Sequence, residues 1–171
     1  MPFEDERITF ADLPALKASG KLPNGQLPIL TVGGEVYAQS VALSRYAAKL
    51  AHLYPAEPLA ALVQDEVVAS LDEAWSKVPS NDAALRAAYG ETVAPKYLAG
   101  VAARLGKDAF FGGAASPQWA DLWAYQYVTF LTSGFFDHLD KEFIAKCAPT
   151  LVEHAARVKA SELYLKHGTP E

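Results

Sequence analysis

This 171-residue chain contains only one cysteine, Cys147. One cysteine excludes an internal disulfide and is typical of a protein kept in a reducing compartment, so we expect a cytoplasmic protein. The net charge is −5, and the sequence has no cluster of lysines or arginines that would form a basic patch. An acidic chain of this kind repels phosphate groups, so nucleic acid is not expected as a partner. The longest uncharged run, residues 122–136, is too short to cross a bilayer. The acidic start, with no apolar segment behind it, is not that of a signal peptide.

The composition that remains is that of a globular protein, with 51% hydrophobic and 20% charged residues. The chain changes character at Pro55 and Pro58, which cannot both lie inside a helix and which indicate a linker. Before these prolines the apolar segments are short and separated by prolines and glycines. After them the chain consists mostly of long segments whose apolar residues recur at helical spacing. We therefore expect two domains, residues 1–54 and residues 59–171.

In the first domain the pattern predicts short strands and one helix. We expect strands at residues 7–10, 27–32 and 35–38, with Gly33 and Gly34 as the hairpin turn between the last two. Apolar residues at helical spacing predict a helix over residues 40–50.

The second domain is predicted to be helical throughout. The spacing of apolar residues predicts helices over residues 59–78, 82–106, 117–133 and 149–167. Gly106 and Gly168 stand where glycines end helices. Gln118 is a poor residue for capping a helix, so the helix near it is expected to begin at Ser116, with Pro117 in its first position.

An ordered set of motifs resembles the cytosolic glutathione S-transferases, and the sigma class in particular. Residues 24–30 (NGQLPIL) and 39–46 (QSVALSRY) resemble the glutathione-binding half, with residues 3–7 similar to the second strand of the sigma class. Residues 119–121 (WAD) resemble the start of the family's buried sixth helix, and residues 149–158 its last long helices. The resemblance implies a truncated thioredoxin-like α/β domain followed by an all-helical domain, with glutathione as substrate.

The first implied site is the Leu27–Pro28 pair. A proline at the head of a strand tolerates a cis peptide bond, and a cis bond here would leave the backbone N–H and C=O of Leu27 free. The cysteinyl part of glutathione would pair with them as an added strand. The alternative is an ordinary proline on an edge strand.

The second implied site is Gln39–Ser40, at the junction of a strand and a helix. A helix N-terminus offers free N–H groups and a positive dipole, both of which favour a carboxylate. The resemblance makes Ser40 the contact of the glutamyl α-carboxylate. The alternative is that Ser40 is only the cap of its helix.

Four further residues are implied by the resemblance. Lys17 would face the glycine carboxylate of glutathione, with Lys21 as the alternative because of an extra residue before Pro23, and Gln26 would flank the peptide. Asp72 would reach the glutathione held by the other subunit of a homodimer. Trp75 would line the hydrophobic co-substrate site, with a core position as the alternative.

The resemblance supplies no catalytic residue. A thiol has a pKa of about 8.5 and needs a donor that stabilises its thiolate. In the sigma class a tyrosine at the end of the first strand does this, whereas this chain begins at the equivalent of the second strand. Cys147 is expected to be a small buried residue. Three alternatives stay open: a transferase acting on hydrophobic electrophiles, a glutathione-dependent prostaglandin isomerase, and a non-catalytic relative.

Overall fold

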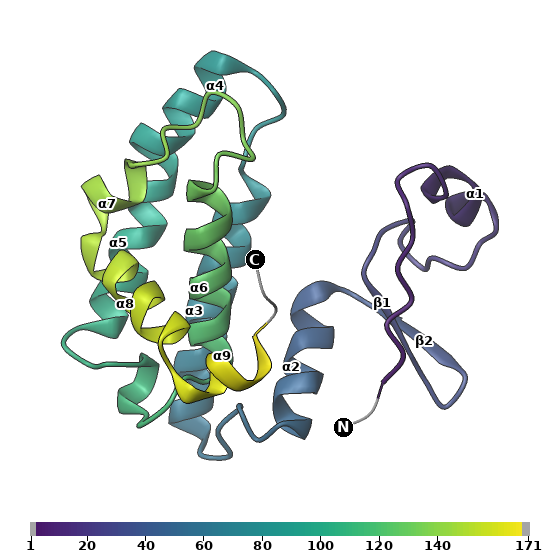
Figure 1. The fold of residues 1–171 in the computed structure, drawn as a ribbon, viewed down its shortest axis with the longest axis horizontal. Helices are drawn as coiled ribbons and strands as arrows, with labels where there is room; N and C mark the ends of the chain where they lie inside the picture. The colour runs from purple at the N-terminus through teal and green to yellow at the C-terminus, as the bar shows by residue number, and fades with distance from the viewer. Residues whose placement is uncertain (1–2, 169–171) are drawn as a thin grey trace. The chain divides into compact units, whose positions relative to one another are not determined.

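The computed structural model describes residues 3–168. The chain divides into two compact units, unit 1 (Met1–Leu53) and unit 2 (Tyr54–Glu171) (Figure 1). Tyr54 belongs to unit 2, where its hydroxyl donates a hydrogen bond to Asp65 (2.8 Å) and its ring packs against that of Trp119.

Unit 1 is built around a β-hairpin followed by a helix. Its elements are α1 (Leu13–Ala18), β1 (Ile29–Val32), β2 (Glu35–Ala38) and α2 (Ser40–Leu50). The two strands are antiparallel, with Ile29 opposite Ala38 and Val32 opposite Glu35. Gly33 and Gly34 have φ of 60° and 89°, and positive φ at both positions is the requirement of the tight turn that joins twisted strands. The predicted hairpin and the helix over residues 40–50 are confirmed.

The predicted strand over residues 7–10 is wrong. Residues 7–9 have no regular structure and Phe10 begins a turn. The backbone N–H and the hydroxyl of Thr9 both donate to the Asp12 carboxylate, at 3.2 and 2.6 Å. Such local bonds compete with strand pairing, and no strand in residues 3–168 lies beside this segment to form a ladder. The turn leads into α1, a helix that the sequence analysis missed.

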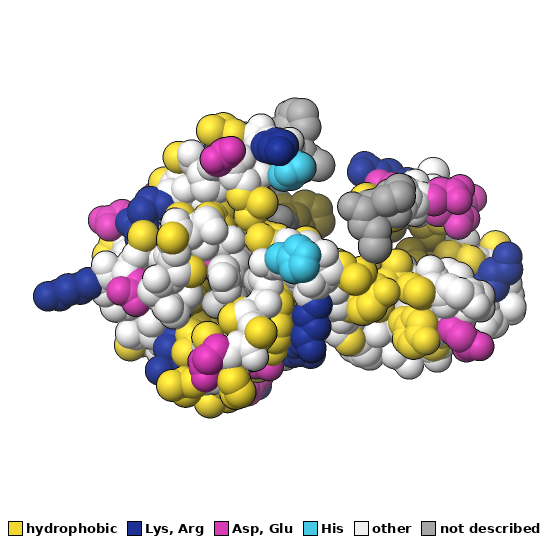
Figure 2. Space-filling view, turned by 90° about the horizontal axis from the view of Figure 1, so that it is seen from below, with side chains coloured by type: hydrophobic (Ala, Val, Ile, Leu, Met, Phe, Trp, Pro, Cys, Tyr) yellow, Lys and Arg dark blue, Asp and Glu magenta, His cyan; other side chains and the backbone are white. Residues whose placement is uncertain are grey.

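Unit 1 has very little core. Among residues 3–53, only Leu22 and Ala48 are buried hydrophobic residues. The large apolar side chains left at the surface are Phe3, Phe10, Leu27, Val32, Val36, Tyr37, Tyr46 and Leu50. Figure 2 shows hydrophobic side chains uncovered over much of the visible face. Because a two-stranded hairpin is marginally stable by itself, unit 1 is expected to be the less stable part of the chain.

Unit 2 is helical, and α6 lies at its centre. Its helices are α3 (Pro58–Ser76), α4 (Ala83–Ala88), α5 (Ala94–Leu105), α6 (Trp119–Thr132), α7 (Phe143–Cys147), α8 (Pro149–Lys159) and α9 (Glu162–His167). Helix α6 packs against both α3 and α8, and α3 also packs against α5 (Figure 1). Helix α3 buries Val67, Leu71 and Ala74 of the predicted apolar period, together with Val68. Leu59 and Leu62, in the first turns of the same period, are exposed instead. No helix within residues 3–168 has the length and apolar character needed to cross a membrane.

Three helix predictions in unit 2 need correction. The helix predicted over residues 82–106 contains a π-helical turn, Tyr89–Val93, between α4 and α5; Pro95 lacks an N–H and cannot continue a regular ladder. The helix predicted over residues 149–167 breaks after α8, because Ser161 caps α9 by accepting from the Tyr164 N–H. Helix α6 begins at Trp119 instead of near Ser116.

Candidate functional site

The hairpin register brings the two predicted glutathione motifs to the same end of unit 1. Ile29 pairs with Ala38, so Leu27–Pro28 precedes β1 where Gln39–Ser40 follows β2. Helix α2 packs against both strands of the hairpin. The Leu27–Pro28 peptide bond is cis, as predicted.

Leu27 has an open side and an unpaired backbone. The residue is 42% exposed, and no hydrogen bond within residues 3–168 uses its backbone N–H or C=O. A buried backbone group without a partner is costly, whereas an exposed one stays available to a ligand. Leu27 therefore offers one donor and one acceptor to an extended peptide.

Gln39 and Ser40 form the entry to α2. Gln39 has φ 78° and ψ 104°, a combination that non-glycine residues rarely adopt and that often marks a functional site. No side chain in the described part of the chain caps this helix, so Ser40 does not act as the cap that was the alternative reading. The first-turn N–H groups and the exposed Ser40 hydroxyl remain available to an anion.

Gln26 and the two lysines lie on the segment that leads to this junction. Gln26 is exposed in the loop directly before Leu27. Lys17 is in the last turn of α1 and Lys21 in the loop after it; both are exposed. Neither lysine has an ion pair among residues 3–168, so either cation is free for an anionic ligand.

Asp72 and Trp75 belong to unit 2, on α3. Asp72 is half-buried, with no partner among the described residues. Trp75 contacts Tyr127, Phe130 and Phe136, with ring centroids 6.5, 5.4 and 5.9 Å away, and stays 38% exposed. Trp75 is thus one side of an aromatic cluster with a face still open to a ligand.

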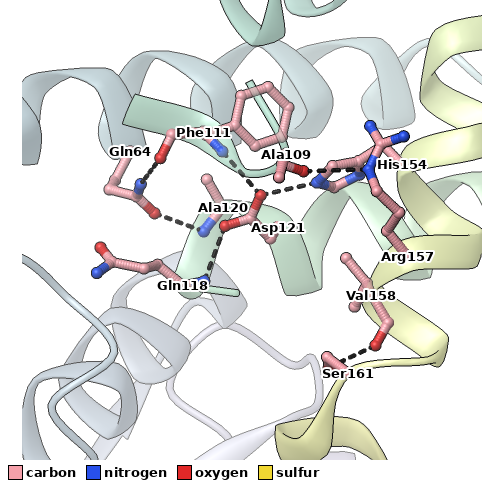
Figure 3. Close-up of polar contacts among 10 residues, drawn as sticks. All are labelled: Gln64, Ala109, Phe111, Gln118, Ala120, Asp121, His154, Arg157, Val158 and Ser161. Carbon is pink, nitrogen blue, oxygen red and sulfur yellow. Dashed lines mark hydrogen bonds and ion pairs between the residues drawn. The ribbon is translucent and has the colours of Figure 1, made fainter. Parts of the chain in front are cut away.

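A buried polar network in unit 2 was not found by the sequence analysis. The Asp121 carboxylate accepts from His154 Nε2 (2.7 Å) and from the N–H groups of Phe111 (3.0 Å) and Gln118 (2.8 Å) (Figure 3). Gln64 on α3 accepts from the Ala120 N–H at 2.8 Å. The Asp121 and His154 side chains have no exposed surface, so the network joins the start of α6 to α3 and α8 and reaches no substrate.

Other titratable groups in the helical core are also unsuited to catalysis. Tyr127 and Tyr89 share a hydrogen bond of 2.7 Å, and burial raises the pKa of both hydroxyls. Cys147 is half-buried, not buried as predicted; its partial burial raises the pKa of the thiol, which makes it a poor nucleophile. No group of three or more His, Cys, Asp or Glu side chains within residues 3–168 could hold a metal ion.

Comparisons with known proteins give a consistent answer. The chain is 31% identical over 145 residues to the hematopoietic prostaglandin D synthase of Gallus gallus, which covers 81% of this chain and 71% of that protein. It is 41% identical over 78 residues to a glutathione S-transferase of Anopheles gambiae, a match over 46% of this chain and 37% of that protein. No family profile matches the chain.

Solved structures show the same fold. The structure of rat hPGDS complexed with a quinoline has a TM-score of 0.79 at 26% identity, covering 100% of this chain and 86% of that chain. The Fasciola hepatica sigma class transferase has a TM-score of 0.77 at 18% identity, covering 99% and 86%. These likenesses confirm the predicted fold class, a small thioredoxin-like α/β unit followed by an all-helical unit. The chain belongs to the glutathione S-transferase family, in the branch of the sigma class and the hematopoietic prostaglandin D synthases.

Proposed function

We propose that the junction of the hairpin with α2 binds glutathione. The observation that carries this proposal is the unpaired backbone of Leu27 beside the uncapped N-terminus of α2. The cysteinyl amide of the tripeptide pairs with Leu27 as an added strand. The glutamyl α-carboxylate accepts hydrogen bonds from Ser40 and from the first turn of α2, where the helix dipole favours negative charge.

The remaining predicted residues complete the tripeptide site. Gln26 flanks the peptide, and Lys17, or Lys21 in its place, pairs with the glycine carboxylate. Asp72 acts across a homodimer, where its carboxylate pairs with the glutamyl ammonium of glutathione bound to the other subunit. Its lack of a partner on α3 supports this role.

The reaction that we propose is transfer of the glutathione thiol to hydrophobic electrophiles, which approach the open face of Trp75. No residue of this chain is assigned to thiol activation, and a single preorganised donor changes such rates by about 10²-fold or more. We therefore expect the 171-residue chain to bind glutathione weakly and to have negligible transferase activity.

A second candidate is a glutathione-dependent prostaglandin isomerase. It is favoured by the match to hematopoietic prostaglandin D synthase, which extends over 145 residues, whereas the match to the Anopheles gambiae transferase extends over 78. Both candidates use the same glutathione site, so a parallel assay with an aryl halide and with a prostaglandin endoperoxide separates them. A folded chain that binds glutathione and acts on neither compound is the non-catalytic relative.

The glutathione site is tested by calorimetric titration of the chain and of Ser40→Ala. Hydrogen bonds to charged groups contribute about 1.5–3 kcal/mol, so the substitution should weaken binding by roughly tenfold or more. Ser76→Ala is the matched control, because its exposed hydroxyl bonds only to the Glu73 carbonyl on α3. Equal affinity in Ser40→Ala and the parent chain would remove Ser40 from the site.

A further inference from the structure

The segment before the proposed glutathione contacts contains an exposed Asn24–Gly25 pair. The two residues lie in the loop between α1 and β1, where the Gly25 N–H donates to the Leu22 carbonyl at 3.0 Å and closes a turn. Asn24 is exposed. Gly25 has φ of 62°, and a Cβ placed on it would meet no heavy atom within 4 Å. Gly25 therefore has no other segment packed against the side of its Cα where a side chain would lie.

An asparagine followed by a glycine is chemically reactive. Asparagine is thermolabile, and a glycine has no side chain to shield its own main-chain nitrogen from the asparagine side chain. When the Gly25 nitrogen loses its proton to water, it can attack Cγ of Asn24. The new N–Cγ bond forms as the Cγ–Nδ2 bond breaks, and Nδ2 takes up a proton and leaves as ammonia. Water then opens the succinimide ring at one of its two carbonyls, which yields aspartate or isoaspartate.

We propose that Asn24 is a site of spontaneous deamidation. The hydrogen bond from Gly25 to Leu22 must open before the nitrogen can react, which slows the step. Its opening is favoured by the position of the turn in unit 1, where few residues are buried, since segments with little buried apolar area open most readily. Each product adds one negative charge, and isoaspartate also adds a methylene group to the main chain.

The change would act on the glutathione site, a consequence that rests on the proposed function. Asn24 is three residues before Leu27, so a longer main chain alters the approach to the backbone that pairs with the tripeptide. The added carboxylate also repels the two carboxylates of glutathione. For charges several ångströms apart in water this repulsion corresponds to about a two- to threefold loss of affinity.

The chain contains its own comparison in Asn81, its other asparagine. Asn81 is followed by Asp82, whose side chain shields the main-chain nitrogen. That nitrogen donates to the Ser80 carbonyl at 2.6 Å, and the Asp82 carboxylate caps α4 through the Leu85 N–H. The two asparagines therefore differ in the residue whose main-chain nitrogen would attack: a glycine follows Asn24, and an aspartate follows Asn81.

The test is to age the purified chain at physiological temperature and at several pH values, and to map its peptides by mass spectrometry. Isoaspartate is detected by methyl transfer from S-adenosylmethionine with a protein isoaspartyl methyltransferase. We expect conversion at Asn24 to rise with time and pH while Asn81 stays intact, and Asn24→Gln to abolish the new acidic species. An intact Asn24, equal conversion of both asparagines, or an acidic species that persists in Asn24→Gln would overturn the proposal.

The effect on glutathione is measured separately, by titrating fresh chain, aged chain and Asn24→Asp. Weaker binding to the last two than to the fresh chain supports the functional consequence, and equal binding to all three refutes it. Fresh chain that binds no glutathione refutes the proposed function. The mapping result would still stand, because it depends on no ligand.

Discussion

Asp121 and His154 are 33 residues apart in the chain and share a hydrogen bond of 2.7 Å between Oδ1 and Nε2. Neither side chain has exposed surface. Because two backbone N–H groups also donate to Asp121, its carboxylate holds together the start of α6, the loop before it and α8. His154 Nδ1 is the one buried side-chain nitrogen or oxygen without a partner among the described residues.

Removing the Asp121 carboxylate should destabilise unit 2 strongly. Asp121→Ala leaves two backbone N–H groups and the His154 ring nitrogen without an acceptor in a buried region. The expected loss in unfolding free energy is about 3–5 kcal/mol, measured by urea denaturation followed by circular dichroism. Asp137→Ala, at an exposed side chain, should change it by no more than about 0.5 kcal/mol. Equal effects of the two substitutions would contradict this role of Asp121.

The two buried tyrosines should differ in what they contribute. The Tyr89 hydroxyl donates to the Ala74 carbonyl at 3.1 Å, so Tyr127 must donate in the 2.7 Å bond that joins the pair. Tyr127→Phe removes one bond and should cost about 1 kcal/mol. Tyr89→Phe also leaves the Tyr127 hydroxyl unpaired and should cost about 1–3 kcal/mol. The reverse order in denaturation experiments would show that the hydroxyls are bonded differently.

The start of α3 should depend on pH through Glu57. Its carboxylate accepts from the N–H groups of Leu59 and Ala60 at 3.0 and 2.6 Å. These bonds lower the pKa of Glu57, with the Leu59 N–H as the largest cause. A lowered pKa means that the stabilisation is complete above the ordinary glutamate pKa and is lost as pH falls through the folded value.

Glu57→Gln should therefore be less stable than the parent chain near neutral pH, and the difference should shrink as the medium is acidified. Thermal melts at a series of pH values measure it, and an NMR titration of the Glu57 side chain gives the folded pKa. A difference that grows on acidification has the wrong sign for this account.

The proposed homodimer gives Asp72 a distinct signature. Asp72→Asn should weaken glutathione binding while leaving the fold of the helical unit unchanged, because Asp72 has no partner among residues 3–168. Asp65→Asn is a useful comparison on the same helix, since Asp65 bonds to Tyr54 within unit 2. Sedimentation should find a dimer. A chain that is monomeric at all concentrations, or one whose glutathione affinity is insensitive to Asp72, would remove this contact.

Local signals in the sequence predicted much of the fold. Gly33–Gly34 marked the hairpin turn, and apolar spacing located α2 and α3 because both helices cover a neighbour with one face. The strand predicted over residues 7–10 is absent because a strand depends on a partner that the pattern cannot supply. The π-helical turn before Pro95 and the break at Ser161 are short interruptions that an apolar period does not register.

The sequence also predicted the local parts of the candidate site, but not the contacts between distant residues. Leu27–Pro28 and Gln39–Ser40 are adjacent pairs whose chemistry is local, and the hairpin register then brings them together. The Asp121–His154 bond joins residues from different helices, and neither residue type indicates its partner. The family motifs at residues 119–121 and 149–158 contain Asp121 and His154, but no sequence signal indicated that these two side chains bond to each other or that Gln64 lies beside them.

The proposal that the junction of β1, β2 and α2 binds glutathione is tested most directly by NMR titration of the ¹⁵N-labelled chain with the tripeptide. The account predicts that the amide resonances of Leu27 and of Ser40 shift together with one saturating affinity. Resonances of the buried polar network around Asp121 should stay unchanged. Saturable binding with no shift at Leu27 or Ser40, or no binding by a chain whose spectrum shows it to be folded, would contradict it.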